Sequence, residues 1–333
     1  MAENVEIVSL AAAERWCALH QNEGLPSHSW HYAMGLSTLG IEPRLAVVDS
    51  GGERLLLPFY ERPWKGRFDI ATVLGLSGAW LSGSTGAPFQ TFKAFAKTRG
   101  WVAGYIQLAP SIEVSHFPDG DRVISTNDLF LLDLGRGDLR QYASAIIRRK
   151  IARAERGGAI LIDDAALLAK HLRLLYPATI ARTGAGPIYD FPVDALTTWA
   201  CDPDVRTYGA LVDGSIEAIS MFRLVRKEAE YQLNACTEKG RGLAAWLIWK
   251  AAARLTTEGV QRLNLGGGIR RGDGLADFKA KFGGTRCELR ALCQVYDPDA
   301  YADLCRRSGC SGTSYFPGYR SSSVDEATSL VLN

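Results

Sequence analysis

The chain has 333 residues, of which 47% are hydrophobic and 22% are charged. Both fractions are close to those of globular proteins, so they exclude a disordered chain, and the length fits one large domain or two of ordinary size. The formal net charge of +2 neither requires nor excludes a polyanionic partner, because a local patch of charge matters more than the total.

Neither a leader, a membrane span nor a metal centre is expected. The first residues, MAENVEIVSLAAAERW, begin acidic and lack a long apolar core, and no stretch approaches the roughly 20 apolar residues of a spanning helix. The seven cysteines are odd in number and include no CxxC pair, which disfavours a zinc ribbon or a full disulfide framework. The sequence therefore predicts a cytoplasmic protein with reduced thiols, no metal and no bound cofactor.

In the first part of the chain, strands are predicted at residues 44–48 and 54–60, around a turn-rich connection. Residues 89–98 read as a helix, and residues 102–108 and 123–134 as strands. A helical segment rich in arginine follows at 148–156 and ends at Gly157-Gly158, as a glycine C-cap predicts.

The second part has a clearer pattern. Strands are predicted at 207–212 and 215–224 around the hairpin turn Asp213-Gly214, and a third at 229–236. A glycine-containing turn at 237–242 leads into a helix at 243–255 that is apolar on nearly every face, and hence buried. A short buried strand at 260–265, a short helix at 273–282 and a strand at 285–296 complete the order.

The two parts share a similar order of elements, which indicates two related α/β halves, each with a mixed sheet flanked by helices. We expect an N-terminal domain at 1–138, a C-terminal domain at 139–310, and a tail rich in serine and glycine at 311–333. The tail is expected to be loop or partly disordered, with Tyr315 and Phe316 packed against the body.

The turn at 237–242 is the first candidate binding site. Backbone N–H groups at the start of the following helix suit an anion such as a pyrophosphate. Gly240, Arg241 and Gly242 have the glycine spacing of the acetyl-CoA loop of GNAT enzymes, although Thr237 stands where that loop usually has Arg or Gln. An ordinary glycine turn explains the pattern equally well.

The second candidate is the segment LNLGGG at 263–268, followed by DGLADFKAKFGG at 273–284. Glycines directly after a buried strand, Gly267 among them, allow close approach of a ligand or of another chain segment. Phe278 and Phe282 share a helix face, while Lys279 near the strand end could stabilise charge on a carbonyl or phosphate. A solvated surface lysine is the alternative.

Two further groups could bind substrate. Arg149, Arg153 and Arg156 form one stripe on a helix and could hold successive phosphates, although a solvated helix face is the usual explanation of such a run. Arg182, Tyr189 and Asp190 come from a helix end and the glycine-rich loop after it, and could bind an acceptor or serve only as surface loop.

These segments resemble the Fem-type aminoacyl transferases. The helix RRKIARAERGGA is similar to the arginine-rich helix that opens the second half of that family, and YPATIARTGAGPIYDF carries its Tyr, Arg and Tyr-x-Phe pattern at Tyr176, Arg182, Tyr189 and Phe191. LNLGGGIRRGDGLADFKAKFGG, with its glycine cluster and Phe-Lys-x-x-Phe-Gly, is the most specific match.

The resemblance implies two tandem GNAT-like domains and transfer of an aminoacyl group from aminoacyl-tRNA to an amine, with amide-bond formation. The acceptor is a cell-wall precursor in the peptidoglycan-building members and a small molecule in relatives from antibiotic pathways. By the same match, Phe278 and Lys279 fall on the pair that family members use for transfer. No heptad-rich helical arm is inserted here, which departs from several cell-wall members.

No Ser-His-acid or Cys-His motif is recognisable, so we expect direct attack of the acceptor amine without a covalent enzyme intermediate. Tyr231, Asn234 or Asp190 could relay the proton of the amine, and the sequence does not choose among them. An acyl-CoA-dependent GNAT N-acyltransferase is the rival enzyme. A degenerate fold kept as an RNA-binding module is the rival that is not an enzyme.

Overall fold

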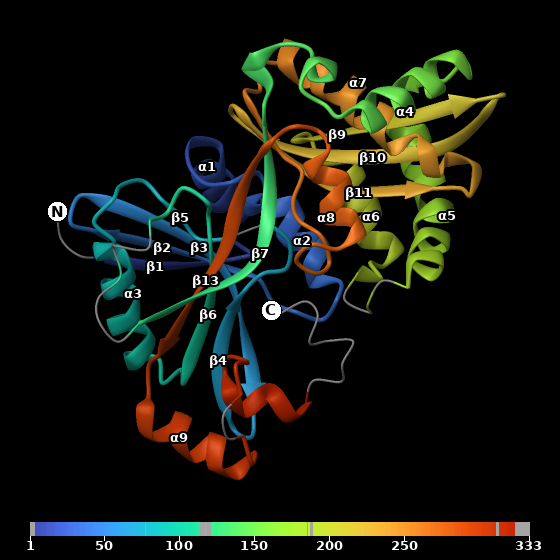
Figure 1. Cartoon of the computed structure of the whole chain (residues 1–333). Helices are drawn as coiled ribbons and strands as arrows, with labels where there is room; N and C mark the ends of the chain where they lie inside the picture. The colour runs from blue at the N-terminus through green and yellow to red at the C-terminus, as the bar shows by residue number, and fades with distance from the viewer. Residues whose placement is uncertain are drawn as a thin grey trace. The chain divides into compact units, whose positions relative to one another are not determined.

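The computed structural model describes residues 4–323 except for 77, 114–116, 118–120, 185, 187–188 and 311–312. The chain folds into two compact units (Figure 1). Unit 1 consists of Met1–Asn127 together with Glu288–Asn333, and unit 2 is the continuous segment Asp128–Cys287. These units differ from the predicted halves in two respects: residues 128–138 group with unit 2, and most of the last strand and everything after it group with unit 1.

Unit 1 is a mixed sheet with helices packed on it. Its strands are β1 (Asn4–Ser9), β2 (Arg44–Ser50), β3 (Glu53–Trp64), β4 (Arg67–Thr72), β5 (Trp80–Leu81) and β6 (Ala103–Leu108), completed by parts of β7 (Arg122–Asp133) and β13 (Thr285–Val295). The order is β1-β2-β3-β4-β6-β13, with β5 paired to β3. Its helices are α1 (Ala13–Asn22), α2 (Trp30–Ser37), α3 (Ala87–Thr98) and α9 (Pro298–Arg307).

Strand β2 is apolar along most of its length because both of its faces are covered. Ala46 and Val48 belong to the core that α3 closes, whereas Leu45 and Val47 pack with Trp16 of α1. Alternate side chains of a strand point to opposite faces, so two helices on two faces require a nearly continuous apolar run.

The end of the described chain is fastened to unit 1 by a buried carboxylate. Asp69 accepts hydrogen bonds from Arg62 Nε at 2.6 Å, Tyr319 Oη at 2.9 Å and Arg320 Nε at 2.7 Å. The Asp69 side chain is fully buried, so each of these contacts replaces water that it would otherwise need. Tyr315 and Phe316 are also buried, as predicted, while residues 311–312 and 324–333 of the predicted tail lie outside the described part.

Unit 2 has its own hydrophobic core and a mixed arrangement of strands. Its strands are β8 (Ile160–Ile162), β9 (Val205–Val212), β10 (Ser215–Val225), β11 (Glu228–Cys236) and β12 (Arg262–Asn264), in the order β7-β12-β11-β10-β9-β8. Its helices are α4 (Ala145–Arg156), α5 (Ala165–Thr183), α6 (Val193–Ala200), α7 (Ala244–Thr257) and α8 (Gly274–Ala280).

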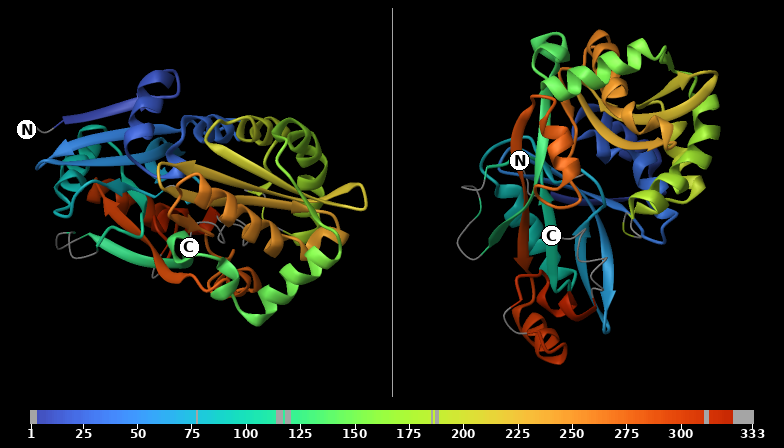
Figure 2. Two further views of the ribbon diagram at one scale, coloured as in Figure 1. Left: turned by 90° about the horizontal axis from the view of Figure 1, so that it is seen from above. Right: turned by 45° about the vertical axis from the view of Figure 1, so that its right-hand side comes forward.

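Four helices of unit 2 form two pairs. Helix α4 packs on α7, and α5 packs on α6. In Figure 1, α4 and α7 lie above β9–β11 while α5 and α6 lie below them, and the right-hand view of Figure 2 again shows the strands between the two pairs. Trp246 and Leu247 of α7 are almost fully buried, which explains why that helix is apolar on nearly every face.

The predicted hairpin and the elements after it are confirmed with small shifts at their ends, as are the earlier predicted strands and helices. Within the described residues, no helix is long and apolar enough to cross a membrane. The seven cysteines, all of them described, are free thiols.

Candidate functional site

The candidate site of unit 2 begins where two neighbouring strands separate. β11 and β12 pair in parallel over Glu228–Glu230 and Arg262–Asn264 only. Asn264 Oδ1 then accepts a hydrogen bond from Gly266 N at 2.8 Å, and Gly266 adopts φ +71°, which glycine tolerates best. The chain of β12 therefore turns aside, while β11 continues to Cys236 paired with β10.

Asp273 anchors the loop that follows to the start of α8. Its Oδ1 accepts hydrogen bonds from Leu275 N at 3.0 Å and Ala276 N at 2.8 Å, and its Oδ2 accepts one from Arg270 N at 2.9 Å. Burial alone would raise the pKa of this carboxyl, but the backbone donors, that of Ala276 foremost, lower it below its ordinary value. A Cβ on Gly268 would lie 2.0 Å from Asp273 Oδ1, so only glycine fits there.

Lys279 of α8 is buried at the separation of the strands. The residue is only 7% exposed, and its Nζ donates a hydrogen bond to Gly267 O at 2.6 Å. Nζ also lies 5.8 Å from the centroid of the Tyr231 ring. Burial lowers the pKa of Lys279 to about 8, an effect that the Asp273 carboxylate opposes. This is not a solvated surface lysine, and Gly267 contributes the carbonyl that holds it.

Phe278 connects this lysine to helix α4. Its ring packs edge-on against Phe282 with centroids 5.2 Å apart, and Lys150 Nζ lies 5.3 Å from its centroid. A cation at this distance from a ring face is attracted by the ring quadrupole. The Phe278-Lys279 pair therefore lies next to Lys150 of helix α4.

Tyr231 and Asn234 of β11 share a hydrogen-bonding partner. Burial raises the pKa of Tyr231, although a hydrogen bond with Ser220 opposes the rise, so its phenol stays protonated near neutral pH. Asn234 Nδ2 donates to Ser220 Oγ and to Ile219 O, both at 3.0 Å. Tyr231 can thus donate a hydrogen bond but is a poor ground-state base.

The predicted acceptor loop is only partly described, because residues 185, 187 and 188 lie outside the described part. Burial, and then the charge of Asp273, raise the pKa of Tyr189. The main-chain oxygen of Tyr189 accepts a hydrogen bond from Tyr176 Oη of α5 at 2.5 Å, and Asp190 is exposed. The described contacts therefore connect Tyr189 to α5 and bring neither residue to Lys279.

Arg182 is hydrogen-bonded to the C-terminal end of β11. Its guanidinium donates to Cys236 O at 3.0 Å and to Cys236 Sγ at 3.2 Å, and Thr179 Oγ1 accepts from Cys236 N at 2.9 Å. Its hydrogen bonds thus go to the strand end rather than to an open cavity.

The turn after β11 is packed tightly on one side and open on the other. A Cβ on Gly240 would lie 1.9 Å from Glu217 O, whereas nothing lies within 4 Å of the position of a Cβ on Gly242. Arg241 is exposed and pairs with Glu238 at 2.7 Å. The first glycine is therefore required by packing, and the second leaves space beside it.

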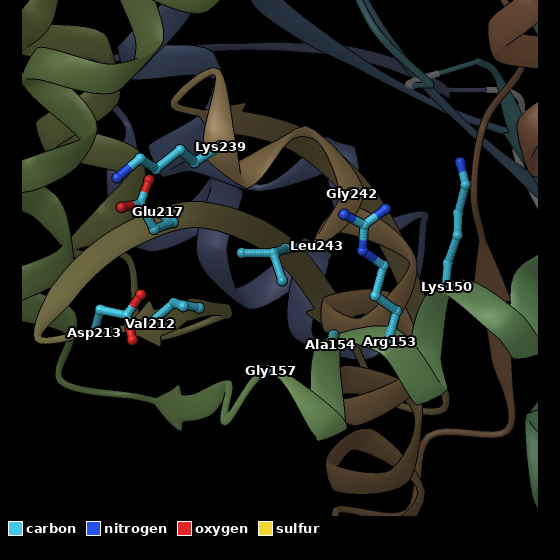
Figure 3. Close-up of a pocket in the computed structure, with 10 residues that line it drawn as sticks. All are labelled: Lys150, Arg153, Ala154, Gly157, Val212, Asp213, Glu217, Lys239, Gly242 and Leu243. Atoms are coloured by element: carbon cyan, nitrogen blue, oxygen red, sulfur yellow. The ribbon is translucent and has the colours of Figure 1, made fainter.

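A pocket of about 300 Å³ occupies that space (Figure 3). It is lined by residues of α4, of the β9–β10 hairpin, of β10 and of the 237–242 turn: Lys150, Arg153, Ala154, Gly157, Val212, Asp213, Glu217, Lys239, Gly242 and Leu243. Two predicted sites, the arginine helix and the glycine turn, meet in this pocket. Lys150 belongs to the pocket and also lies over Phe278, so it connects the pocket with the Lys279 group.

The arginine stripe of α4 is exposed as predicted. Ile147, Ile151 and Ala154 are buried, which turns the remaining face outward. Among the described residues, no carboxylate lies within ion-pair distance of Arg149, Arg153 or Arg156, and only Arg153 of the three lines the pocket.

The sequence missed four members of these groups: Lys150, Glu217, Lys239 and Asp273. Asp273 carried a readable signal, since an aspartate directly before a short helix is a typical N-cap. Lys150 and Lys239 lie within the two segments predicted as candidate sites, although they were not singled out there. Glu217 lacks a signal, because only the fold brings α4, β10 and the turn together. No group of three or more His, Cys, Asp or Glu side chains that could hold a metal occurs among the described residues.

Comparison with known proteins gives structural likeness without a sequence match. No protein-family model matches the sequence, and no curated protein matches it. FemX is similar in structure with a TM-score of 0.66 and 12% identity over 90% of this chain and 99% of its own. The C-terminal DUF2156 domain of an Agrobacterium fabrum protein described as a lysylphosphatidylglycerol synthetase has a TM-score of 0.61 and 18% identity over 90% of this chain and 97% of its own.

L-PGS from Bacillus licheniformis has a TM-score of 0.57 and 17% identity over 83% of this chain and 91% of its own. At these identities the likeness establishes the fold. It confirms the predicted α/β class, with a GNAT-like fold of the Fem kind.

Proposed function

We propose that the chain is a transferase that moves an aminoacyl group from aminoacyl-tRNA to the amine of a small molecule or a cell-wall precursor, forming an amide. The observation that carries the proposal is the buried Lys279, held by Gly267 O at 2.6 Å where β11 and β12 separate. A buried cation beside an opening of the sheet suits a carbonyl oxygen that gains negative charge. The fold shared with FemX and with lysylphosphatidylglycerol synthetases, whose name denotes a lysyl group joined to its acceptor, supports the aminoacyl donor.

In this mechanism the acceptor amine attacks the ester carbonyl of the donor directly. The new C–N bond forms as the carbonyl oxygen becomes negative, and the Lys279 ammonium stabilises that oxygen. The C–O bond to the terminal ribose then breaks, and the proton of the amine passes to the ribose oxygen. Alignment of the two substrates supplies much of the rate.

Tyr231 is the best placed of the predicted relay groups. Its ring is 5.8 Å from Lys279 Nζ, and its raised pKa keeps the phenol proton available for donation to the oxyanion or the leaving oxygen. Asn234 is occupied by Ile219 O and Ser220 Oγ, so it orients Ser220 instead.

The basic groups are assigned to the donor. Arg153 and Lys150 line the pocket, and Arg149 and Arg156 continue the exposed stripe along α4, where they can contact further phosphates. Gly242 and Leu243, just before α7, line the same pocket, so the positive end of that helix lies beside it.

An acyl-CoA donor is the second candidate, favoured by the open side of the turn at Gly242. A pyrophosphate that binds there would share the pocket with the Glu217 carboxylate and with the cations Lys150, Arg153 and Lys239. An RNA-binding module without turnover is the third, and it would tolerate loss of Lys279.

The test is acyl transfer from total tRNA charged with labelled amino acids to a mixture of primary amines, with and without ribonuclease, beside an acetyl-CoA arm. We expect a product that ribonuclease abolishes, and loss of that product in Lys279→Met. Lys281→Met, two positions along the same segment, is the matched control and should keep activity. Product from acetyl-CoA alone would establish the second candidate, and tRNA binding without product the third.

A further inference from the structure

The pocket between α4 and the 237–242 turn is lined by charges of both signs. In Figure 3, the side chains of Glu217 and Asp213 lie on one side together with Lys239, and those of Arg153 and Lys150 lie on the other. Its volume of about 300 Å³ is at the lower end of small-ligand sites, which excludes a duplex and admits a small part of a ligand. An occupant should therefore be small and should combine an anion with hydrogen-bond donors.

Glu217 is held in place by the turn that faces it. Thr237 Oγ1 donates to its Oε2, and Thr237 N donates to Glu217 O at 2.9 Å. Gly240 packs directly on the same main-chain oxygen, so the turn lies tightly against this residue. Within the described part of the chain, Oε1 of Glu217 has no hydrogen-bond donor, which leaves it to accept one from a ligand.

The other side of the pocket suits a phosphate. Arg153 and Lys150 are exposed cations without an ion-pair partner among the described residues. Leu243, which precedes α7, also lines the pocket, and the first turn of α7 has no side-chain cap. The positive dipole end of this helix adds to the attraction for an anion.

We infer that this pocket is a nucleotide subsite, in which Glu217 accepts a hydrogen bond from the exocyclic amine of a base while Arg153 and Lys150 hold a phosphate. Cytosine and adenine carry such an amine at C4 and C6, and the amine of cytosine is a typical donor to a carboxylate. Uracil and hypoxanthine carry an oxygen at that position, which a carboxylate repels. The subsite deepens the proposed function and rests on it for the donor, because it names the part of the donor that the pocket selects.

Two sources share this chemistry: the single-stranded 3′ end of an RNA and the adenine nucleotide of CoA. Both bring an amine-bearing base and a phosphate. The lining of the pocket predicts that a base with an exocyclic amine binds more tightly than a base without one. Competition between the RNA 3′ end and CoA shows which of the two fills the pocket.

The test is equilibrium binding of CMP against UMP, and of AMP against IMP, to the full chain, measured by calorimetry. We expect the amine-bearing member of each pair to bind at least about fivefold tighter. Glu217→Gln should remove that preference, since its amide both donates and accepts. Arg153→Ala should weaken CMP and UMP by the same factor.

Glu155→Gln is the matched control, because Glu155 lies on α4, pairs with Lys250 and does not line the pocket. It should leave the preference intact, and unchanged melting curves should show that each variant is folded. Equal binding of CMP and UMP by the wild type, or a preference that survives Glu217→Gln, would overturn the inference.

Competition assigns the source. A minihelix that ends in CCA should displace bound CMP, and the same RNA with its two terminal cytosines changed to uracil should displace it more weakly. Displacement by CoA alone would assign the pocket to CoA, and displacement by neither would overturn the link to a donor. Binding needs no turnover, so a chain that selects CMP but transfers nothing from aminoacyl-tRNA would refute the proposed function and leave the subsite standing.

Discussion

Replacing Lys279 with methionine should change stability and activity in opposite directions. In the native state the pKa of Lys279 is about 8, against an ordinary value of 10.5, because the ammonium is buried. That difference corresponds to about 3 kcal/mol, and since the residue is only 7% exposed, solvent hardly reduces it. At pH 7 Lys279 is still protonated, so burial of its charge lowers the free energy of unfolding of unit 2 by this amount.

Methionine has a similar shape and no charge, so Lys279→Met removes the cost and loses one hydrogen bond to Gly267 O, worth about 1 kcal/mol. Unit 2 should therefore become more stable by about 2 kcal/mol at pH 7. If Lys279 stabilises the oxyanion, kcat should fall about 100-fold to 1000-fold in the same variant. Hydrogen exchange of amides in residues 128–287 measures the first quantity, and transfer from charged tRNA measures the second.

The pH dependence supplies an independent check. Between about pH 8 and 10.5 the native lysine has lost its proton while the unfolded chain keeps it. Unfolding takes up a proton in that window, so wild-type stability rises with pH relative to the methionine variant. The advantage of the variant should shrink by up to about 3 kcal/mol across the window. A variant less stable than the wild type at pH 7, or one with unaltered turnover, would refute the reasoning.

Four further substitutions test packing and charge. Gly240→Ala places a Cβ 1.9 Å from a main-chain oxygen and should destabilise unit 2 by about 3 kcal/mol, measured by hydrogen exchange. Gly242→Ala, where nothing lies near the new Cβ, should cost under about 1 kcal/mol. Equal effects of the two substitutions would contradict the packing of the turn. Asp202→Ala leaves the buried Arg223 without its carboxylate and should cost about 3–5 kcal/mol by the same measurement, and a loss below 1 kcal/mol would argue against that ion pair. Arg156→Gln should reduce the salt dependence of tRNA binding by about 0.7–0.9 in the slope of log Kd against log salt, and an unchanged slope would place the RNA elsewhere.

Local patterns in the sequence predicted the elements but not their partners. The Asp213-Gly214 turn and the runs beside it fixed the β9–β10 hairpin, because that pairing is set within a few residues. The strand at 285–296 was also predicted, yet its assignment to the second half differs from the compact units. Arg290 of β13 pairs with Leu108 of β6, and no local periodicity carries information about so distant a partner.

The candidate site divides in the same way. The glycines of 266–268 and the Phe278-Lys279 pair were readable, since their spacing lies within one segment. The burial of Lys279 was not readable, because it depends on Gly267 O and on the Tyr231 ring of another strand. The carboxylate of Glu217 in the pocket was missed for the same reason, since a glutamate on a predicted strand gives no sign of the turn that will face it.

The order of the two units along the chain has a consequence for synthesis. Unit 2 is continuous, so all of it has left the ribosome while unit 1 still lacks the strand residues from Glu288 on, α9 and the segment with Tyr319 and Arg320. Until those residues are made, β6 lacks its β13 partner and the buried Asp69 lacks two of its three donors. The nascent chain should thus pass through a stage with one finished unit and one open sheet edge, the kind of surface that chaperones protect.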